Sequence, residues 1–249
     1  MWQGDFVFAE RWNVCRFLLI LYGISGCISA PARLLWPVEI SIKTDVDMKN
    51  EILYVLLPDF AEHEIVYLAE AVASDEYALK ENPKYVNKMV APTAEPVKSI
   101  GGLRVLPDYS FDTMPEDYVA LVLIGGFGWL TPVADEVVPL VRRAVESGKI
   151  VGAICNAASF MAKHGFVNGV AHTGNGVEQL RLWGGENYTN EKMYEHKQAV
   201  ADQRVVTANG SATLEFAKEL LLLLENDTPE RIEMFYQFNK RGFCALFKE

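Results

Sequence analysis

Cys155 is the residue whose type and surroundings most clearly permit chemistry in this chain. It stands between Ile154 and Asn156, where the apolar run KIVGAI ends and helix-forming residues begin. Small residues, Ala153 and Ala157, lie two positions before and after it, as a sharp strand-to-helix turn requires. The pattern predicts a nucleophile elbow that lifts the thiol above the carboxyl end of a sheet, where α/β folds bind ligands.

The predicted position also bears on the reactivity of this thiol. Unpaired N–H groups at a helix N-terminus favour negative charge, so we expect the pKa of Cys155 to lie below the usual cysteine value of about 8.5. Such a thiolate is both a nucleophile and a target for oxidation. A buried core cysteine is the alternative interpretation, because unpaired cysteines are often buried.

Two more loops are expected at the same sheet edge. Gly125–Gly128 follows a buried strand, and its N–H groups, together with that of Asn156, are candidates for an oxyanion hole. Phe127 in this loop is a candidate to line the pocket. The loop after the first strand carries titratable side chains, one of which is a candidate partner for the thiol: Asp59, Glu62, His63 and Glu64.

The remaining pattern predicts the elements that position these residues. Apolar runs of strand length alternate with amphipathic segments, which favours an α/β fold with a mostly parallel sheet. We expect strands at 51–57, 84–91, 118–124, 149–154 and 203–207, a hairpin at 96–106, and helices at 62–73, 131–146, 157–163, 212–224 and 229–239. Pro139 lies inside one predicted helix and indicates a kink or a late start there.

Residues 1–47 differ in character from the predicted domain at 48–249. The apolar run 17–30 follows Arg11 and Arg16, which is the layout of a secretory signal, and it is short for a membrane span. A signal would make the protein exported or membrane-associated. Alternatively, translation starts near Met48, directly before the first strand, and the protein is cytoplasmic.

Composition excludes several classes of partner and site. The chain has 23 basic and 33 acidic residues and a formal charge of −10, which gives no attraction for nucleic acid. Its four cysteines form no CxxC or Cys/His pattern, so we expect no metal site and no disulfide framework. We also expect no membrane partner for the main domain.

Four segments in order carry a resemblance to a known family: LLPDFAEHE, LVLIGGFGW, GAICNAASFMAKHG and VVTANGSATLEFAKELL. The chain resembles the ThiJ/PfpI family of the class I glutamine-amidotransferase-like superfamily, relatives of the Parkinsonism-associated deglycase. The resemblance implies a flavodoxin-like three-layer sandwich that is usually a homodimer, with a small-molecule substrate and no cofactor. It also implies that Cys155 is the nucleophile and that a protonated Glu64 hydrogen-bonds its sulfur, with oxyanion donors at Gly126 and Asn156.

The chain departs from the family pattern at its histidines. Asn156 follows the cysteine where hydrolytic members often carry histidine, and Asn175 occupies the usual position of a second histidine. His172, nearby in the same loop, is the alternative candidate for a base. The segment Thr207–Gly210 replaces the His-x-Glu of glutaminases, so the resemblance does not extend to glutamine hydrolysis.

Two functions of different classes follow from these residues. The first is a cysteine-dependent enzyme acting on a carbonyl or amide, as a hydrolase, a deglycase or a glyoxalase-like lyase. The second is a non-catalytic stress-response protein that senses redox conditions through oxidation of Cys155.

Overall fold

A computed structural model of the chain describes residues 50–74 and 80–246. The predicted extension at 1–47 lies outside the described residues. The central feature is a seven-stranded sheet in the order β5-β2-β1-β6-β7-β9-β8. Its strands are β1 (Glu51–Val55), β2 (Val86–Ala91), β5 (Tyr109–Ser110), β6 (Ala120–Leu123), β7 (Ile150–Ile154), β8 (Ala199–Asp202) and β9 (Val205–Ala208). All neighbours pair in parallel except β8 and β9.

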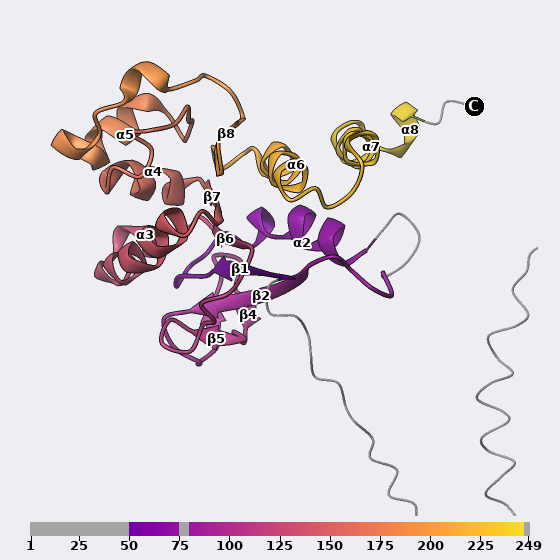
Figure 1. The fold of residues 1–249 in the computed structure, drawn as a ribbon, viewed down its shortest axis with the longest axis horizontal. Helices are drawn as coiled ribbons and strands as arrows, with labels where there is room; N and C mark the ends of the chain where they lie inside the picture. Colours follow the sequence, from indigo (N-terminus) through magenta and orange to yellow (C-terminus); the bar gives the residue numbers. More distant parts are fainter. Residues whose placement is uncertain (1–49, 75–79, 247–249) are drawn as a thin grey trace, which may run out of the picture. The chain divides into compact units, whose positions relative to one another are not determined.

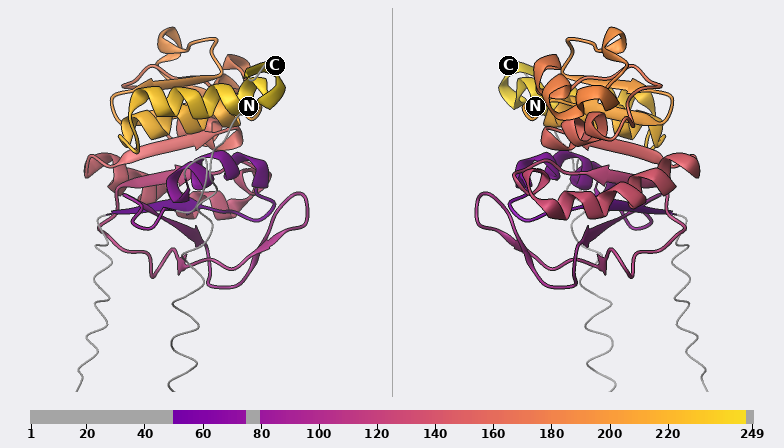
Figure 2. Two further views of the ribbon diagram at one scale, coloured as in Figure 1. Left: turned by 90° about the vertical axis from the view of Figure 1, so that its right-hand side faces the viewer. Right: turned by 90° about the vertical axis from the view of Figure 1, so that its left-hand side faces the viewer.

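Helices cover both faces of this sheet, so the domain has three layers (Figures 1 and 2). One face carries α3 (Val138–Glu146) and α4 (Asn156–Lys163), with α5 (Val177–Gly184) packed on α4. The other carries α2 (Val66–Ala73) and α6 (Thr213–Leu223). The remaining helices are α7 (Pro229–Arg241), α8 (Phe243–Leu246) and short 3-10 turns at Glu62–Glu64, Gly128–Leu130, Pro132–Val137, Gly185–Asn187 and Glu191–Met193.

The central strands are apolar on both faces because each face meets a helix layer. Every residue of β1, β6 and β7 is buried. Leu53 and Val151 pack toward α3 and α4, whereas Ile52 and Val122 pack toward α2 and α6. Burial of one such side chain contributes about 1.5–3 kcal/mol. This explains why near-continuous apolar runs, rather than alternating ones, marked the parallel strands.

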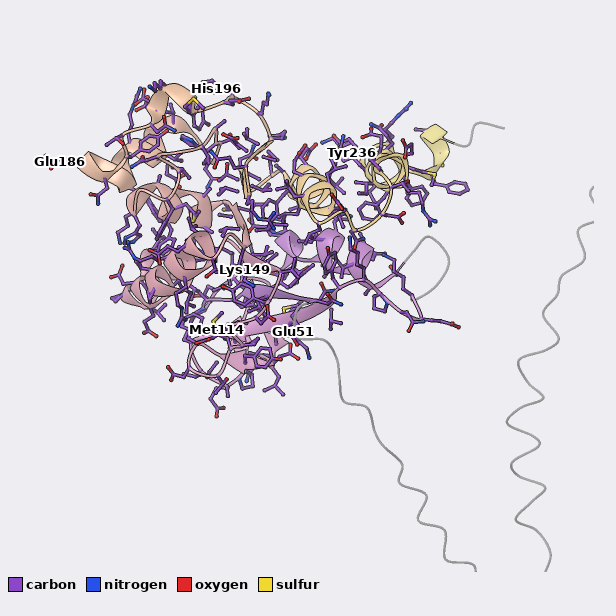
Figure 3. The ribbon with its side chains drawn as sticks, viewed as in Figure 1. Glu51, Met114, Lys149, Glu186, His196 and Tyr236 are labelled. Carbon is purple, nitrogen blue, oxygen red and sulfur yellow. The ribbon has the colours of Figure 1, made fainter. Side chains whose placement is uncertain are left out.

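The C-terminal helix α7 lies against α6 rather than on the sheet. Tyr236 of α7 donates a hydrogen bond to Glu215 of α6 at 2.9 Å, and Lys240 forms an ion pair with the same carboxylate at 2.7 Å. Figure 3 shows Tyr236 on this side of the molecule and His196 on the side of α5. The helix therefore extends the layer that α2 and α6 form.

The structure confirms the predicted α/β class and corrects several element boundaries. The late start at Pro139 is confirmed, because a 3-10 turn at Pro132–Val137 precedes α3. The predicted helix at 62–73 begins as a 3-10 turn and becomes α-helical only at Val66. The hairpin, β3 (Val97–Lys98) and β4 (Arg104–Val105), forms its own two-stranded sheet and not an edge of the main one. The strands β5 and β8 and the helix α5 were not predicted.

Candidate active site

Four loops meet where β1, β6, β7 and β9 end, and main-chain hydrogen bonds hold them together. The N–H of Ala61 donates to Gly125 O at 2.9 Å, which joins the loop after β1 to the loop after β6. The N–H of Phe127 donates to Asp59 O at 3.0 Å across the same pair of loops. The N–H of Cys155 donates to Ala208 O at 3.0 Å and anchors the end of β7 to β9.

Cys155 has the backbone strain of a nucleophile elbow. It lies between β7 and α4 with φ 61° and ψ −127°, a region that residues with a side chain rarely adopt. Strain of this kind costs about 1–3 kcal/mol and persists where the surrounding fold enforces it. The small neighbours Ala153 and Ala157 are fully buried, as the turn predicted from the sequence requires.

Glu64 is the carboxylate from the first loop that reaches the elbow. Its side chain is 3% exposed, and its Oε2 accepts a hydrogen bond from Gly125 N–H at 2.7 Å. The other oxygen, Oε1, is buried and has no hydrogen-bond partner among the described residues. A Cβ at Gly125 would lie 2.5 Å from both Cys155 Cβ and Glu64 Oε2, so only glycine lets the carboxyl come this close to the cysteine.

Burial controls the protonation of this carboxyl group. It raises the pKa of Glu64 to about 7, because a charge inside the protein loses hydration. The hydrogen bond from Gly125, the nearby His63 and the Cys155 thiol each lower the pKa in part. Glu64 therefore changes its protonation state near neutral pH, as an acid–base catalyst must.

The expected lowering of the thiol pKa is wrong for this structure. Burial raises the pKa of Cys155 above its ordinary value, and the Glu64 carboxylate raises it further. The amide of Asn175 and the backbone N–H of Asn156 favour the thiolate but do not offset these two effects. The helix N-terminus is present as predicted, but the enclosure of the sulfur outweighs it.

Two backbone N–H groups are the candidates that the sequence offered for oxyanion donors. The N–H of Gly126 forms no hydrogen bond with any described residue. The N–H of Asn156 is the first in α4 and interacts with the Cys155 sulfur. The Asn156 side chain donates to Gly126 O at 2.9 Å and accepts from Gln179 at 2.9 Å. These two bonds link the start of α4 to the loop after β6 and to α5.

An amide and a glycine close the other side of the thiol. Asn175 Nδ2 donates to Cys155 Sγ at 3.5 Å, and its Oδ1 accepts from Gly210 N–H at 2.9 Å. A Cβ at Gly210 would lie 2.8 Å from the sulfur. His63 Nε2 is 3.4 Å from Gly210 O and spans the first and last loops. Gly210 is a site residue that was not predicted, although the Asn-Gly pair after the last strand indicates a turn there.

His172, the predicted alternative base, does not lie at the thiol. Its ring is fully buried, with Nδ1 2.9 Å from Val170 O and Nε2 2.7 Å from the Tyr188 hydroxyl. Burial lowers its pKa, so the ring is neutral at neutral pH. Nδ1 then donates to the carbonyl and Nε2 accepts from the tyrosine, which leaves no ring nitrogen for Cys155. His172 also pairs with Tyr194 in an isolated parallel β-bridge, and its ring lies between the rings of Tyr188 and Tyr194.

Phe127, predicted to line the pocket, is exposed rather than enclosed. Its side chain is 56% exposed, and its N–H is held by Asp59 O. It follows Gly126 directly, so it lies at the outer edge of the site. Trp129, farther along the same segment, is 3% exposed and donates from its ring nitrogen to Ile124 O at 2.7 Å, which makes it a core residue.

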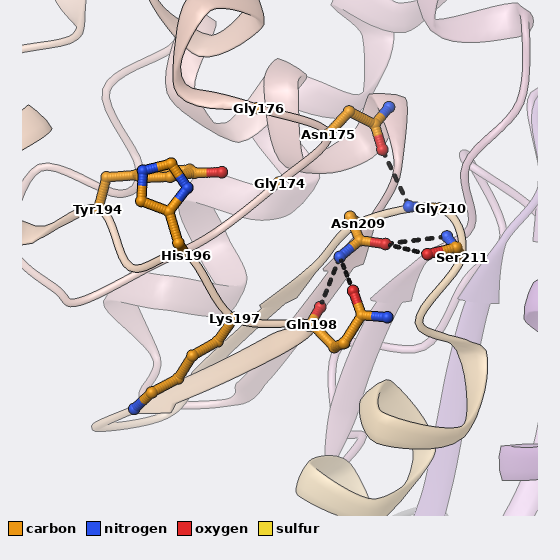
Figure 4. A pocket seen from close by; sticks show the side chains of 10 residues that line it. All are labelled: Gly174, Asn175, Gly176, Tyr194, His196, Lys197, Gln198, Asn209, Gly210 and Ser211. Atoms are coloured by element: carbon orange, nitrogen blue, oxygen red, sulfur yellow. Dashed lines mark hydrogen bonds between the residues drawn. The ribbon is translucent and has the colours of Figure 1, made fainter. Parts of the chain in front are cut away.

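An open groove of about 770 Å³ begins beside the cysteine. Asn175 and Gly210, which both contact Cys155, lie in its wall (Figure 4). The full lining comes from three segments of the chain: Gly174, Asn175, Gly176, Tyr194, His196, Lys197, Gln198, Asn209, Gly210 and Ser211. This volume falls within the range of small-molecule sites in proteins, about 300–1,000 Å³.

Two other kinds of site are absent from residues 50–74 and 80–246. Within these ranges, no three histidine, cysteine, aspartate or glutamate side chains gather in a way that could hold a metal ion. None of the helices described there is long and apolar enough to cross a membrane.

Comparisons with known proteins agree with this fold. The chain is 35% identical over 192 residues to the uncharacterized protease YdeA of Bacillus subtilis, covering 77% of this chain and 91% of the relative. It is 30% identical over 145 residues to the glutathione-independent glyoxalase DJR-1.2 of Caenorhabditis elegans, covering 56% of this chain and 72% of that protein.

Solved structures and a family model extend the comparison. The crystal structure of a DJ-1 superfamily protein from Agrobacterium tumefaciens matches with a TM-score of 0.68 and 35% identity, covering 77% of this chain and 98% of the other. The model of the DJ-1/PfpI family matches residues 50–223, which include β1, the elbow and α6. The chain therefore belongs to the DJ-1/PfpI family.

Proposed function

We propose that the protein is a cysteine-dependent enzyme that converts a small α-oxoaldehyde into the corresponding 2-hydroxy acid. The observation that carries this proposal is the pairing of Cys155 with a carboxyl, Glu64, whose pKa is raised to about 7. Such a carboxyl takes and returns a proton near neutral pH. The group that reaches the sulfur from the other side, Asn175, is an amide and transfers no proton.

The first step forms a bond between the sulfur and the aldehyde carbon. As Cys155 attacks, its thiol proton passes to the Glu64 carboxylate, so the raised thiol pKa is no obstacle. The π electrons of the carbonyl move to oxygen, where the N–H groups of Gly126 and Asn156 would stabilise the developing charge. Return of the proton from Glu64 to this oxygen gives a neutral hemithioacetal.

The later steps move a proton between neighbouring carbons and add water. Glu64 removes the proton from the former aldehyde carbon, giving an enediolate, and returns a proton to the adjacent carbon. The hydroxyl proton moves from the former aldehyde oxygen to the former ketone oxygen in the same rearrangement. The product is a thioester of the 2-hydroxy acid on Cys155. Water hydrolyses that thioester and releases the acid and the free thiol. The balance is one water consumed, with no external oxidant or reductant.

Amide hydrolysis is less well supported by the same geometry. One relative is named a protease and another a glyoxalase. Hydrolysis of an amide requires an acid that protonates the leaving nitrogen as the bond breaks, a task that histidine performs in thiol proteases. Both ring nitrogens of His172 are occupied by Val170 and Tyr188. The glyoxalase-like chemistry needs only the thiol and Glu64.

The redox-sensing alternative is weakened by the state of the thiol. Oxidation by peroxide proceeds through the thiolate, and burial together with Glu64 raises the pKa of Cys155. The resting cysteine is therefore largely protonated at neutral pH. An enzyme that deprotonates its thiol only during attack is consistent with this arrangement.

The test is turnover of methylglyoxal and phenylglyoxal by the full chain. Formation of lactate or mandelate is followed by proton NMR in D2O, and the product is expected to carry deuterium at carbon 2, because the proton there comes through Glu64 from solvent. Cys155→Ala is expected to abolish turnover. Cys244→Ala, which changes the other free cysteine of the described residues, is the matched control and should keep it.

Two results would count against the proposal. Equal turnover by native protein and Cys155→Ala would show that the cysteine is not the nucleophile. Turnover that Glu64→Gln leaves unchanged would remove Glu64 from the proposed role.

We also infer that the protein forms a homodimer, as its family membership favours. Large apolar side chains on the described surface near the site loops are consistent with an interface: Ile100, Leu103, Phe127 and Leu130. Light scattering during size-exclusion chromatography of the full chain tests this, and a monomeric mass at micromolar concentration would contradict it.

A further inference from the structure

Two side-chain amides connect α5 to the loop that follows β6. Gln179 donates from Nε2 to Asn156 Oδ1 at 2.9 Å, and Asn156 donates from Nδ2 to Gly126 O at 2.9 Å. These residues, here called the amide relay, come from α5, from the first position of α4 and from the loop after β6. Both candidate oxyanion donors, the N–H groups of Gly126 and Asn156, therefore belong to residues of the amide relay.

The amide relay can run in one direction only. Gly126 O is a carbonyl oxygen and accepts, so Asn156 must turn its NH2 group toward it. Asn156 Oδ1 then faces α5 and needs a donor there. Gln179 supplies that donor, whereas a carboxylate of the same size would not. The residue type at position 179 therefore decides whether Asn156 is held on both sides.

Gly126 depends on hydrogen bonds for its orientation. It has φ 132°, and a Cβ there would lie 2.3 Å from Asp59 O, so only glycine fits. Because glycine has no side chain, its backbone also rotates more freely than that of other residues. Two bonds fix the peptide unit between Gly126 and Phe127: Phe127 N–H donates to Asp59 O at 3.0 Å, and Asn156 donates to Gly126 O. Without the second bond this peptide unit would be held on one side only.

Other residues supply the packing of α5 on α4. Leu180, which follows Gln179, is fully buried and belongs to the hydrophobic core on this face of the sheet. At the end of α5, Gly184 approaches α4 so closely that a Cβ there would lie 3.2 Å from Ala162 O. Gln179 itself is half-buried. Removal of its amide should therefore leave the two helices in contact.

The start of α5 also reaches the sulfur. Gln179 N–H donates to Gly176 O at 3.1 Å, and Asn175, directly before Gly176, donates to Cys155 Sγ at 3.5 Å. Asn156 follows Cys155 directly in the chain. The short stretch 175–179 thus contacts both the sulfur and the amide relay.

From these contacts we propose that Gln179 is a positioning residue for the oxyanion hole. Through Asn156, it holds the loop after β6 and the start of α4 so that the N–H groups of Gly126 and Asn156 stabilise a carbonyl oxygen under attack by Cys155. Donors that are held in place in advance are effective because they need no rearrangement during the reaction. The inference rests on the proposed function for the cysteine nucleophile and for the oxyanion that its attack creates.

Two reagents separate the oxyanion hole from the reactivity of the thiol. With p-nitrophenyl acetate, the sulfur of Cys155 bonds to the acetyl carbon, the thiol proton passes to Glu64 or water, and p-nitrophenolate leaves with the bonding electrons. This reaction passes through a tetrahedral oxyanion. Iodoacetamide alkylates the same sulfur by displacement of iodide at a saturated carbon, which creates no oxyanion. Peptide mass mapping of the full chain after short reaction times gives both rates at Cys155, and the readout is the ratio of acetylation to alkylation.

Substitutions at position 179 test the donor. Gln179→Met keeps the length of the side chain without its N–H groups and is expected to lower the ratio about tenfold. Gln179→Glu at pH 8 places a carboxylate against Asn156 Oδ1 and should lower the ratio at least as much. The matched control is Gln237→Met on α7, since Gln237 is also half-buried and donates to Glu233 at 2.8 Å, and it should leave the ratio unchanged. Circular dichroism checks that each variant is folded.

A double variant tests whether Gln179 acts through Asn156. Asn156→Ala removes the side chain of the amide relay, keeps the backbone N–H and is expected to lower the ratio about tenfold. Gln179→Met added to Asn156→Ala should lower it by less than about twofold more, because the amide relay is already broken. Two losses that multiply would show that Gln179 acts independently of Asn156.

The outcomes distinguish this inference from the proposed function. The positioning role is overturned if native Cys155 is not acetylated, if both Gln179 variants keep the native ratio, or if the losses multiply in the double variant. It is also overturned if acetylation and alkylation fall together, because a general disturbance of the site slows both. A lowered ratio in a protein that converts no α-oxoaldehyde overturns the proposed reaction and supports the amide relay. Turnover of methylglyoxal together with a native ratio in Gln179→Met does the reverse.

Discussion

Cys155 and His172 both lie near the carboxyl edge of the sheet, but their surroundings differ. The fold gives both ring nitrogens of His172 a hydrogen-bond partner, whereas it holds Cys155 in a strained backbone conformation beside a partly unpaired carboxyl group. The His172 ring is fully buried, both its nitrogens have partners, and the rings of Tyr188 and Tyr194 flank it. Neither ring nitrogen of His172 is left to bind a ligand. A histidine in this state stabilises the loop that it belongs to.

The surroundings of Cys155 show the opposite pattern. Its backbone is strained at φ 61°, Glu64 Oε1 has no hydrogen-bond partner among the described residues, and burial raises the pKa of both groups. Each of these features lowers the stability of the folded protein. Local features that work against folding concentrate at functional sites. The contrast teaches that strain and an unsatisfied polar group distinguish the candidate site at this sheet edge better than residue type does.

The largest expected effect is the loss of activity when Glu64 changes. Glu64→Gln keeps the size of the side chain and the acceptor for Gly125 N–H, but it removes the acid–base group. We expect kcat/KM for an α-oxoaldehyde to fall by about 10²–10⁴. The matched control is Glu62→Gln in the same turn, which should stay within about threefold of native. Equal losses in both variants would mean that Glu64 has no special role.

The next largest effect tests the structural role of His172. His172→Ala leaves the Tyr188 hydroxyl without a partner, removes one of the two side-chain hydrogen bonds to Val170 O and opens a cavity, so we expect a loss of about 2–4 kcal/mol in the free energy of unfolding. Urea denaturation measures it. His196→Ala, at an exposed ring, should change the stability by about 0.5 kcal/mol or less. A variant of His172 with native stability and no activity would break the comparison and restore His172 as the base.

The fold could be predicted from the sequence because strands that are buried on both faces are apolar along almost their whole length. The apolar run at 51–57 needed no knowledge of its neighbours to be recognised as a parallel strand, and β1 is buried throughout. The missed strand β5 has only two residues, and β8 is a short strand at the sheet edge. Such elements carry little periodicity, so their pairing depends on the rest of the sheet.

The site could be predicted only in part because distances and burial are not local properties. The elbow at Cys155 follows from small neighbours at fixed spacing, which the sequence displays. The raised pKa of Cys155 follows from its enclosure and from Glu64, which is distant in sequence. The burial of His172 depends on its partners Val170 O and the Tyr188 hydroxyl, contacts that no motif around His172 reveals.

A smaller effect is expected on the stability of Glu64→Gln. The substitution that lowers activity should raise the free energy of unfolding. A carboxyl whose pKa is raised in the folded protein holds its proton more tightly there than in the unfolded chain. Stability therefore falls as pH rises from the unfolded value, 4.5, to the folded value, about 7, and the loss is complete above that. At about 1.4 kcal/mol per pKa unit, Glu64→Gln is expected to gain up to about 3 kcal/mol.

Urea denaturation at two pH values measures this gain. At pH 8 the Glu64→Gln variant should be more stable than the native protein, and near pH 4.5 the difference should vanish, because Glu64 is then protonated in both states. A gain of the same size at both pH values would show that packing, and not protonation, is responsible. In that case the buried negative charge of Glu64 would not be what destabilises the folded protein.

The smallest and most informative effect concerns the thiol itself. The Glu64 carboxylate raises the pKa of Cys155, so Glu64→Gln is expected to move the pH profile of Cys155 alkylation to lower pH. Iodoacetamide labelling with peptide mass mapping measures the profile, and Cys244, exposed in the same chain, is an internal control that should not move. A shift to higher pH would mean that a protonated Glu64 stabilises the thiolate by donating a hydrogen bond. The resting site would then hold a preformed thiolate, and the first step would need no proton transfer to Glu64.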